Sequence, residues 1–325
     1  MNGLKIIFMG TAELSCASLE KLVGQASSLS GDRQDVYPTI EIVGVVTQPD
    51  KPHGRELKLQ APPVKVLAEK FNIPVLQPPK ARDEHFISQL KELQPDLIVV
   101  VAYGHILPPA ILDLPRFGCL NVHTSLLPKY RGAAPIQWAI ANGETETGVT
   151  IMKLDAGMDT GPMLTQKRTP ISAQDDSAIL YDRLAQLGAE LLLETIPGYV
   201  SGKIQPTPQP EPATYAPKIK KEDGQIDWKL PAQTILNRLR AFMPWPGAFT
   251  FLKSVPKQNL LKIWKAEVVQ KTGNPEEIIS ADSQGITIAC GKDALNILEL
   301  QREGGRRMSA AEFLAGHPLR PGNKL

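Results

Sequence analysis

The sequence predicts an α/β protein with two domains, and three observations carry this prediction. About the first 200 residues alternate short apolar runs with helix-like segments, the pattern of a doubly wound domain. Short alternating segments with close turns follow residue 217, and they predict a small β-barrel. Five prolines lie between the two patterns, in a chain whose 325 residues suffice for two domains. We therefore expect an α/β domain over residues 1–203, a linker over residues 204–217 and a β-barrel domain over residues 218–325.

The first domain is predicted to alternate strands with helices. The expected strands cover residues 5–9, 40–47, 73–76, 97–101, 120–123, 148–153 and 163–167. The expected helices cover residues 12–23, 63–71, 83–93 and 177–193. Residues 97–101 read Leu-Ile-Val-Val-Val, and a wholly apolar strand is typical of a parallel sheet covered on both faces. Residues 83–93 carry apolar side chains at spacings of three and four, which predicts a helix with one buried face.

The linker and the second domain follow from proline content and strand length. Proline fixes φ and removes a backbone donor, so residues 204–217 can join neither a helix nor a central strand. We expect them to run extended, at about 3 Å per residue. The later strands are expected at residues 247–251, 260–269, 276–280, 286–289 and 295–300. Helices are expected at residues 232–242 and 309–314.

The composition excludes several classes of protein. Hydrophobic residues make up 42% and charged residues 22%, which are ordinary values for a globular chain. The longest apolar run has about seven residues, far short of the ~20 that cross a bilayer, and the first run is too short for a signal peptide. Cys16, Cys119 and Cys290 lie far apart, which disfavours a disulfide framework or a zinc site. We therefore expect a cytoplasmic protein without a metal.

The net charge of +2 hides an uneven distribution. Residues 218–325 hold 17 of the 36 basic side chains and 11 of the 34 acidic ones, a net charge of +6, which leaves −4 for residues 1–217. Such asymmetry favours an acidic partner such as nucleic acid, although a random split would produce it equally well.

The most informative stretch covers residues 118–135, GCLNVHTSLLPKYRGAAP. Asn121 and His123 are two residues apart on a predicted strand, so their side chains share one face. At the carboxyl end of a parallel strand they would project into the crevice where open α/β sheets bind ligands. His123 alone would fit a structural histidine, but its combination with Asn121 and the turn that follows favours a functional site. The first turn, FMGTAELS, lacks G-x-G-x-x-G, which counts against a dinucleotide-binding enzyme.

A second candidate segment is the loop DAGMDTG, residues 155–161. Turn formation alone would explain its Asp and Gly residues. If the loop closes over Asn121 and His123, Asp159 completes a set of amide, imidazole and carboxylate. Such a set suits acyl transfer to an amine without a covalent intermediate, because an oxyanion donor contributes ~10²–10³ in rate and acid–base help ~10²–10⁴. Ser125 has no obvious base and Cys119 has an unremarkable context, so no candidate nucleophile dominates.

At these residues the sequence resembles the folate-dependent formyltransferases. The likeness is carried by NVH, SLLPKYRGAAP, DAGMDTG and VAYGHILP in the first domain, and by YAPKIKKEDGQIDW, RAFMPWPGAFT and MSAAEFLAG after the linker. Over its whole length the chain is similar to the branch that formylates methionyl-tRNA. The resemblance implies a Rossmann-like formyltransferase domain followed by an OB-like, tRNA-binding barrel. It also implies 10-formyltetrahydrofolate as formyl donor, methionyl initiator tRNA as partner, no metal and no membrane; we expect a monomer.

The resemblance also implies roles for individual residues. Asn121 would polarise the formyl oxygen, His123 would stabilise the oxyanion and assist the leaving N10, and Asp159 would orient His123 and help to deprotonate the amine. An α-amine has a pKa of roughly 8, so part of it is neutral near pH 7. The folate pocket would include Tyr103, Gly104, Ile106, Ser125, Leu126, Leu127 and Pro128. The tRNA would meet Arg55, Lys58, Lys218, Lys220 and Lys221, which would otherwise be ordinary solvated lysines and arginine.

Two other functions remain open at this point. An amino-sugar nucleotide formyltransferase would share the Asn–His–Asp site, but the basic loop at Arg55 and Lys58 and the carboxy-terminal motifs favour tRNA. A non-catalytic RNA-binding protein would have no need to keep Asn121, His123 and Asp159 together.

Overall fold

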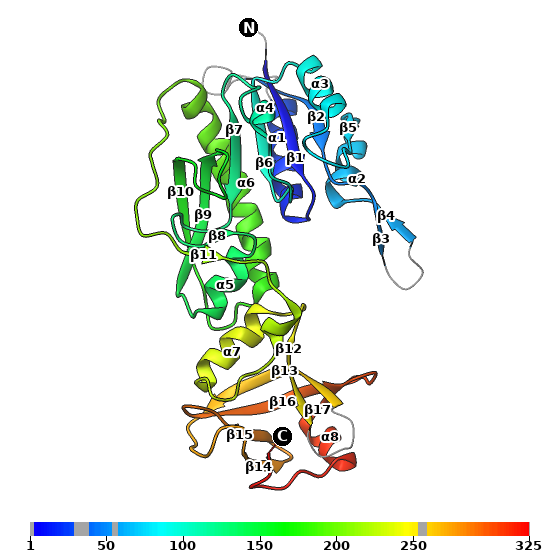
Figure 1. Cartoon of the computed structure of the whole chain (residues 1–325), viewed down its shortest axis with the longest axis vertical. Coiled ribbons are helices and arrows are strands. Elements are labelled where there is room, and N and C mark those ends of the chain that lie inside the picture. Colours follow the sequence, from blue (N-terminus) through cyan, green and yellow to red (C-terminus); the bar gives the residue numbers. More distant parts are fainter. Residues whose placement is uncertain (1–2, 29–38, 54–57, 253–258, 325) are drawn as a thin grey trace. The chain divides into compact units, whose positions relative to one another are not determined.

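The computed structural model of the chain describes residues 3–28, 39–53, 58–252 and 259–324 (Figure 1). The chain divides into two compact units. The first comprises residues 1–132, 146–170 and 181–215, and the second comprises residues 133–145, 171–180 and 216–325. The domain limits expected at residues 203 and 218 stay a prediction.

The first unit is built on a seven-stranded sheet with the order β10-β9-β7-β6-β1-β2-β5. Its strands are β1 (Leu4–Gly10), β2 (Ile40–Val46), β5 (Val75–Leu76), β6 (Leu97–Val101), β7 (Cys119–His123), β9 (Glu146–Lys153) and β10 (Met163–Pro170). The run from β5 to β7 is parallel, whereas β9 is antiparallel to β7 and β10 to β9. The predicted α/β class is confirmed. The reversal at β9 is not encoded in the apolar pattern, because alternation reports burial and not strand direction.

Helices pack on the sheet because the contact removes the apolar stripe of each helix and the apolar face of the sheet from water. The helices of this part are α1 (Leu14–Ser28), α2 (Pro63–Lys70), α3 (Glu84–Glu92), α4 (Pro109–Leu112) and α6 (Ser177–Val200). Phe86 and Leu90 of α3 join a buried cluster with Ile7 of β1 and Ile98 of β6. Each such side chain contributes about 1.5–3 kcal/mol by burial. Every residue of β6 is buried, as its uninterrupted apolar run predicts.

A glycine sets the distance between α6 and the sheet. A Cβ built on Gly188 would lie 2.7 Å from Cγ1 of Val122, closer than real Cβ contacts come. Helix α6 therefore lies against the face of β7 that carries Val122. Because side chains alternate along a strand, Asn121 and His123 point to the opposite face. The packing of α6 thus leaves that face available for a site.

The structure also contains short elements that periodicity does not predict. They include the hairpin of β3 (Lys51–His53) and β4 (Lys58–Gln60), and the pair of β8 (Arg131–Gly132) and β11 (Tyr215–Ala216); the elements at residues 109–112, 135–141 and 307–309 are not predicted either. Two or three residues are too few to show a period of two or of 3.6. Strand β11 lies in the predicted linker, which is tied to the first unit: the backbone N–H groups of Thr207 and Met163 each donate to the other's carbonyl at 2.8 Å.

The second unit holds an antiparallel sheet with the order β12-β13-β16-β15-β14, and β17 pairs with β16. Its elements are α5 (Pro135–Ala141), the 3₁₀ turn at Lys221–Gly224, α7 (Ala232–Ala241), β12 (Ala248–Leu252), β13 (Asn259–Val269), β14 (Ile278–Asp282), β15 (Gly285–Ala289), β16 (Ala294–Arg302), β17 (Arg307–Ser309) and α8 (Ala310–Gly316). Helix α8 begins with a capping box: Ser309 Oγ accepts from the Glu312 N–H, and Glu312 accepts from the Ser309 N–H. The five predicted strands and both predicted helices are present, with limits that shift by one to two residues.

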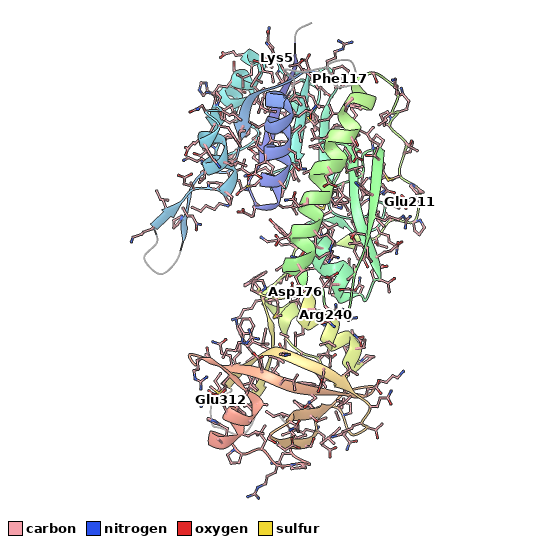
Figure 2. All side chains as sticks on the ribbon, turned by 180° about the vertical axis from the view of Figure 1, so that it is seen from behind. Lys5, Phe117, Asp176, Glu211, Arg240 and Glu312 are labelled. Atoms are coloured by element: carbon pink, nitrogen blue, oxygen red, sulfur yellow. The ribbon has the colours of Figure 1, made fainter. Side chains whose placement is uncertain are left out.

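Within the second unit, Arg240 of α7 holds the segment 171–180 (Figure 2). Its guanidinium donates to the backbone carbonyls of Ser172, Ala173 and Asp175 at 2.9–3.2 Å. Burial lowers the pKa of Arg240, an effect opposed by Asp175 and Asp176. One side chain therefore satisfies three backbone acceptors of a segment that has no sheet partner there.

Candidate functional site

Strand β7 presents Asn121 and His123 on one face, as the sequence predicts. Asn121 is half-buried and His123 is 5% exposed. The neighbouring β9 pairs with β7 so that Thr150 lies opposite His123 and Met152 opposite Asn121. The loop that follows β9 therefore begins close to both side chains.

The histidine ring has an oxygen atom near each of its nitrogens. Nε2 lies 3.0 Å from the carbonyl oxygen of Tyr130, and Nδ1 lies 3.7 Å from Oδ2 of Asp159. A carbonyl only accepts, so Nε2 must carry the proton in this contact. Nδ1 is then the nitrogen that faces the carboxylate of Asp159.

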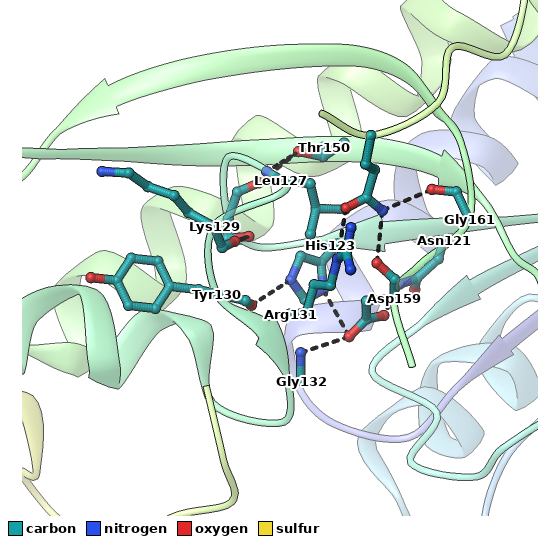
Figure 3. Close-up of polar contacts among 12 residues, drawn as sticks. Asn121, His123, Leu127, Lys129, Tyr130, Arg131, Gly132, Thr150, Asp159 and Gly161 are labelled. Carbon is teal, nitrogen blue, oxygen red and sulfur yellow. Dashed lines mark hydrogen bonds and ion pairs between the residues drawn. The ribbon is translucent and has the colours of Figure 1, made fainter. Parts of the chain in front are cut away.

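The carboxylate of Asp159 joins three parts of the site (Figure 3). Oδ2 accepts from the backbone N–H of Gly132 at 2.8 Å and faces His123. Oδ1 lies 3.5 Å from Nδ2 of Asn121, a long contact. Asp159 itself has φ of +54°, in the left-handed region that an aspartate adopts at a cost. The loop 155–161 does close over the Asn–His pair.

The turn after β7 is held by backbone and side-chain hydrogen bonds. The Ser125 hydroxyl donates to the carbonyl of Lys129 at 2.6 Å, and the Thr150 hydroxyl donates to the carbonyl of Ser125 at 2.7 Å. Gln166 donates to the carbonyl of Leu127 at 2.8 Å. Ser125 is fully buried, and its only proton serves this turn. The hydroxyl of Ser125 therefore holds this turn and does not act as a nucleophile.

Cys119 is also excluded as a nucleophile. It lies on β7 with 1% exposure, and burial raises the pKa of its thiol to about 12. The thiolate is the reactive form of cysteine, so Cys119 stays inert near neutral pH.

The predicted folate residues fall into two groups. Tyr103, Ser125 and Leu127 are buried, Leu126 and Pro128 are half-buried, and Gly104 and Ile106 are exposed. Thr11 and Gln48 both donate to the carbonyl of Tyr103, at 3.0 and 2.9 Å, beside a cavity of about 240 Å³. Gly104 has φ of +81° and lies so close to Gln48 that a Cβ would meet its Nε2 at 2.7 Å. The segment after β6 is thus fixed in place, and its role in folate binding stays a prediction.

The predicted tRNA-binding residues are divided between the two units. Arg55 lies outside the described residues. Lys58 is exposed on β4, and Lys218, Lys220 and Lys221 are exposed near the 3₁₀ turn of the second unit. Asp223 accepts from the backbone N–H of Lys220 at 2.7 Å, so acidic and basic groups mix there.

Other residues contact the site through backbone atoms or from a distant part of the sequence, and the sequence does not identify them. The carbonyl of Tyr130 and the N–H of Gly132 contact His123 and Asp159, and Arg131 between them is 7% exposed. These three residues lie in the motif KYRGAAP, which marks the segment but not the backbone atoms that make the contacts. Gln209 also contacts the site, and its proline-rich surroundings carry no signal of a role. Among the described residues, no group of three or more His, Cys, Asp or Glu could hold a metal ion, and no helix is long and apolar enough to span a membrane.

Known protein families match the chain over most of its length. A family model described as "Formyl transferase" matches residues 4–196, and one described as "Formyl transferase, C-terminal domain" matches residues 218–318. Proteins named methionyl-tRNA formyltransferase from Citrifermentans bemidjiense and Trichlorobacter lovleyi are 49% and 52% identical to this chain over 326 aligned positions. The matches cover all of this chain and 97% and 98% of those proteins.

Solved structures share the fold at low identity. An N-formyltransferase from Helicobacter canadensis, in complex with folinic acid and dTDP-3-aminofucose, gives a TM-score of 0.63 at 19% identity, over 91% of this chain and 99% of that one. HypX from Aquifex aeolicus, in complex with tetrahydrofolic acid, gives 0.61 at 18% identity, over 96% of this chain and 47% of that one. These likenesses show a common fold.

Proposed function

This chain belongs to the formyl transferase family, and from that premise we propose that it transfers the formyl group of 10-formyltetrahydrofolate to the free α-amine of methionyl initiator tRNA. The observation that carries the proposal is the cluster of Asn121, His123 and Asp159, in a chain matched along its whole length by methionyl-tRNA formyltransferases. Formyl transfer is an acyl transfer, which such a cluster suits.

The reaction defines what the three side chains must do. A bond forms between the amine nitrogen and the formyl carbon, and the bond from that carbon to N10 of the folate breaks. The amine loses a proton and N10 gains one, so no oxidant or further reactant is needed. The folate supplies the formyl carbon, and this chain supplies hydrogen-bond donors and a proton carrier.

Asn121 and His123 are proposed to stabilise the oxyanion. Nδ2 of Asn121 is a fixed donor, and its 3.5 Å contact with Asp159 is long enough to yield to a stronger acceptor. Nε2 of His123 is committed to Tyr130, so Nδ1 is the nitrogen that faces the reacting atoms. Protonated at Nδ1, His123 can donate to the oxyanion and later assist the departure of N10.

Asp159 is proposed to hold His123 and to help remove the amine proton. Its carboxylate lies 3.7 Å from Nδ1 of His123 and is anchored by Gly132 at 2.8 Å. The side chain of Asp159 is only 16% exposed, so little water screens the interaction of its charge with neighbouring groups. The carboxylate therefore lies next to the nitrogen of His123 that is proposed to meet the reacting atoms, where it can accept a proton.

The exposed apolar side chains support a place for the folate. Ile106, in the segment after β6, is 78% exposed, and Met158, beside Asp159, is 61% exposed. Ile106 follows β6, which pairs with β7, and exposed apolar side chains together with a few polar groups suit a flat ring system. We propose that the segment 103–106 and the turn 125–128 bind it.

The tRNA is proposed to meet Lys58 and the lysines at 218, 220 and 221, all of which are exposed. Arg55 belongs to the same proposal. A protein that acts on initiator tRNA belongs in the cytoplasm, and we propose that it acts there as a monomer.

One assay tests the function directly. The full-length protein is given labelled 10-formyltetrahydrofolate together with methionyl-tRNA or an amino-sugar nucleotide. We expect label in the tRNA only. Label in the sugar nucleotide and not in the tRNA would establish the rival function, and label in neither would leave a non-catalytic RNA-binding protein.

A further inference from the structure

Gln209 lies in the proline-rich segment but contacts the loop of Asp159. Its Nε2 donates to the backbone carbonyl of Asp159 at 2.7 Å and to that of Gly161 at 2.8 Å. A side-chain amide has two N–H donors, so both are used on this one loop. Gly161 passes so close to the base of the loop that a Cβ would lie 2.0 Å from the carbonyl oxygen of Lys153. The end of the loop is therefore held both by the close packing of Gly161 against Lys153 and by the two hydrogen bonds from Gln209.

The remaining atom of the amide contacts the other side of the site. Oε1 of Gln209 accepts from Nε of the buried Arg131 at 2.9 Å. Arg131 stands between Tyr130, whose carbonyl accepts from His123, and Gly132, whose N–H donates to Asp159. The amide of Gln209 thus joins the loop that carries the carboxylate to the turn that orients the imidazole.

The segment around Gln209 is itself anchored on both sides. Before it, Thr207 and Met163 exchange backbone hydrogen bonds at 2.8 Å. After it, Thr214 accepts from the N–H of Arg131 through its carbonyl and from the N–H of Tyr130 through its hydroxyl, both at 2.9 Å. Because these contacts order the segment already, little further entropy is lost when Gln209 binds the loop.

We infer that Gln209 is a positioning residue for Asp159: through the loop backbone it sets where the carboxylate lies relative to His123 and Asn121. Gln209 does not touch the reacting atoms. The inference rests on the proposed function, because it assumes that Asp159 takes part in formyl transfer. The inference gives the proline-rich linker, residues 204–217, a role in the reaction in addition to joining the two domains.

Two variants of the full-length protein test this role. Gln209→Ala removes all three hydrogen bonds, and Gln209→Glu keeps the size and the acceptor for Arg131 but loses both N–H donors. We expect kcat to fall roughly 10- to 100-fold in each, since a displacement of about 1 Å can cost ~10² in rate. The KM values for folate and for methionyl-tRNA should stay as in the unaltered protein, because neither binding surface is changed.

The matched control is Gln205→Ala. Gln205 lies four residues earlier in the same segment, and its Nε2 donates to the carbonyl of Gly202 at 2.7 Å, away from the loop. This variant should keep its kcat and its melting temperature. If Gln209→Ala does not fold, Gln209→Glu carries the test.

A double-mutant cycle separates positioning from general support. If Gln209 acts through Asp159, Gln209→Ala should cause little further loss of kcat in an Asp159→Asn background. Equal losses of kcat in both backgrounds would overturn the inference, as would an unchanged kcat in Gln209→Ala and Gln209→Glu. If Asp159→Asn has no measurable rate, the single variants at Gln209 decide the question. A lower kcat with unchanged KM values supports the positioning role, and an unchanged kcat overturns it.

The result distinguishes this inference from the proposed function. A protein that formylates methionyl-tRNA, is impaired by Asp159→Asn and is unaffected at Gln209 contradicts only the positioning role. A protein that does not formylate methionyl-tRNA at all contradicts the proposed function.

Discussion

His123 shows how single residues combine in this site. Its position two residues after Asn121 is visible in the sequence, but the use of each ring nitrogen is not. The contact of Nε2 with the Tyr130 carbonyl leaves Nδ1 for the proposed chemistry, at 3.7 Å from the Asp159 carboxylate. That assignment depends on a backbone atom, and backbone atoms carry no sequence signature.

We expect His123→Ala to lose at least ~10²–10³ in kcat, the contribution of one oxyanion donor. The variant should fold, with a stability loss of about 1–3 kcal/mol because the buried Tyr130 carbonyl loses its donor. Initial-rate kinetics and thermal melting measure these two effects, and tRNA binding should stay largely intact. The control is His85→Ala on α3, which is exposed and should keep full activity. Undiminished activity in His123→Ala would sink the proposed site.

Cys119 provides a test against a covalent mechanism. Its thiol pKa of about 12, and values of about 11 for Cys16 and Cys290, mean that all three stay protonated near pH 8. An acid whose pKa is raised deprotonates only at higher pH, so reactivity should appear above about pH 10. We expect iodoacetamide at pH 8 to leave the transfer rate unchanged over minutes. Rapid inactivation that follows the labelling of Cys119, seen by mass spectrometry, would contradict the site described above.

At the scale of elements, the long strands and helices follow their apolar patterns closely. Strand β6 and helix α3 are predicted from uninterrupted apolar residues and from a 3–4 spacing, and both are present. The short pairs β3–β4 and β8–β11 are not predicted, because they form only when distant segments bring their backbones together. The proline-rich linker is predicted from composition to run extended. Its hydrogen bonds to the site are tertiary contacts, which composition does not encode.

The contact between α6 and β7 makes a prediction about Gly188. In an open helix Gly→Ala gains up to about 1 kcal/mol, but here the added Cβ would meet Val122 at 2.7 Å. Overpacking costs about 1–3 kcal/mol, so we expect Gly188→Ala to be destabilising. Denaturant unfolding of Gly188→Ala is compared with Gly24→Ala on α1, where nothing lies within 4 Å of the added Cβ and stability should rise.

A second substitution at Val122 tests whether the contact with Val122 causes the loss of stability in Gly188→Ala. Adding Val122→Ala to Gly188→Ala removes the methyl groups that the new Cβ meets, so the double variant should be more stable than additive losses predict. Simple additivity of the two losses would refute the close contact.

At the scale of the whole molecule, the total charge of +2 is the sum of about −4 for residues 1–217 and +6 for residues 218–325. Composition alone does not say whether this asymmetry has a use. Family membership and the exposed lysines at 218, 220 and 221 support tRNA as the partner of the basic part.

We expect tRNA affinity to fall with salt, with a log–log slope of about −0.7 to −0.9 per phosphate contact. Replacing Lys218, Lys220 and Lys221 together by alanine should weaken binding and reduce the slope by about 2–3 if all three meet phosphates. Filter binding of methionyl-tRNA across salt concentrations measures both. The control is Lys271→Ala, an exposed lysine on a distant part of the chain, which should leave the slope unchanged. A flat salt response in the unaltered protein would favour a sugar-nucleotide acceptor.

The sequence by itself determined the α/β class, the long elements, and Asn121, His123 and Asp159 as candidates, since burial patterns and unusual polar residues are local properties of the chain. Only the tertiary structure decided the reversal of β9, the roles of the Tyr130 carbonyl and the Gly132 N–H, and the place of Gln209. These features arise where segments far apart in the chain, such as Gln209 and Asp159 at a separation of 50 residues, form hydrogen bonds that involve backbone atoms, which every residue possesses. Such contacts depend on where the fold brings two segments, and no residue pattern within either segment encodes that meeting.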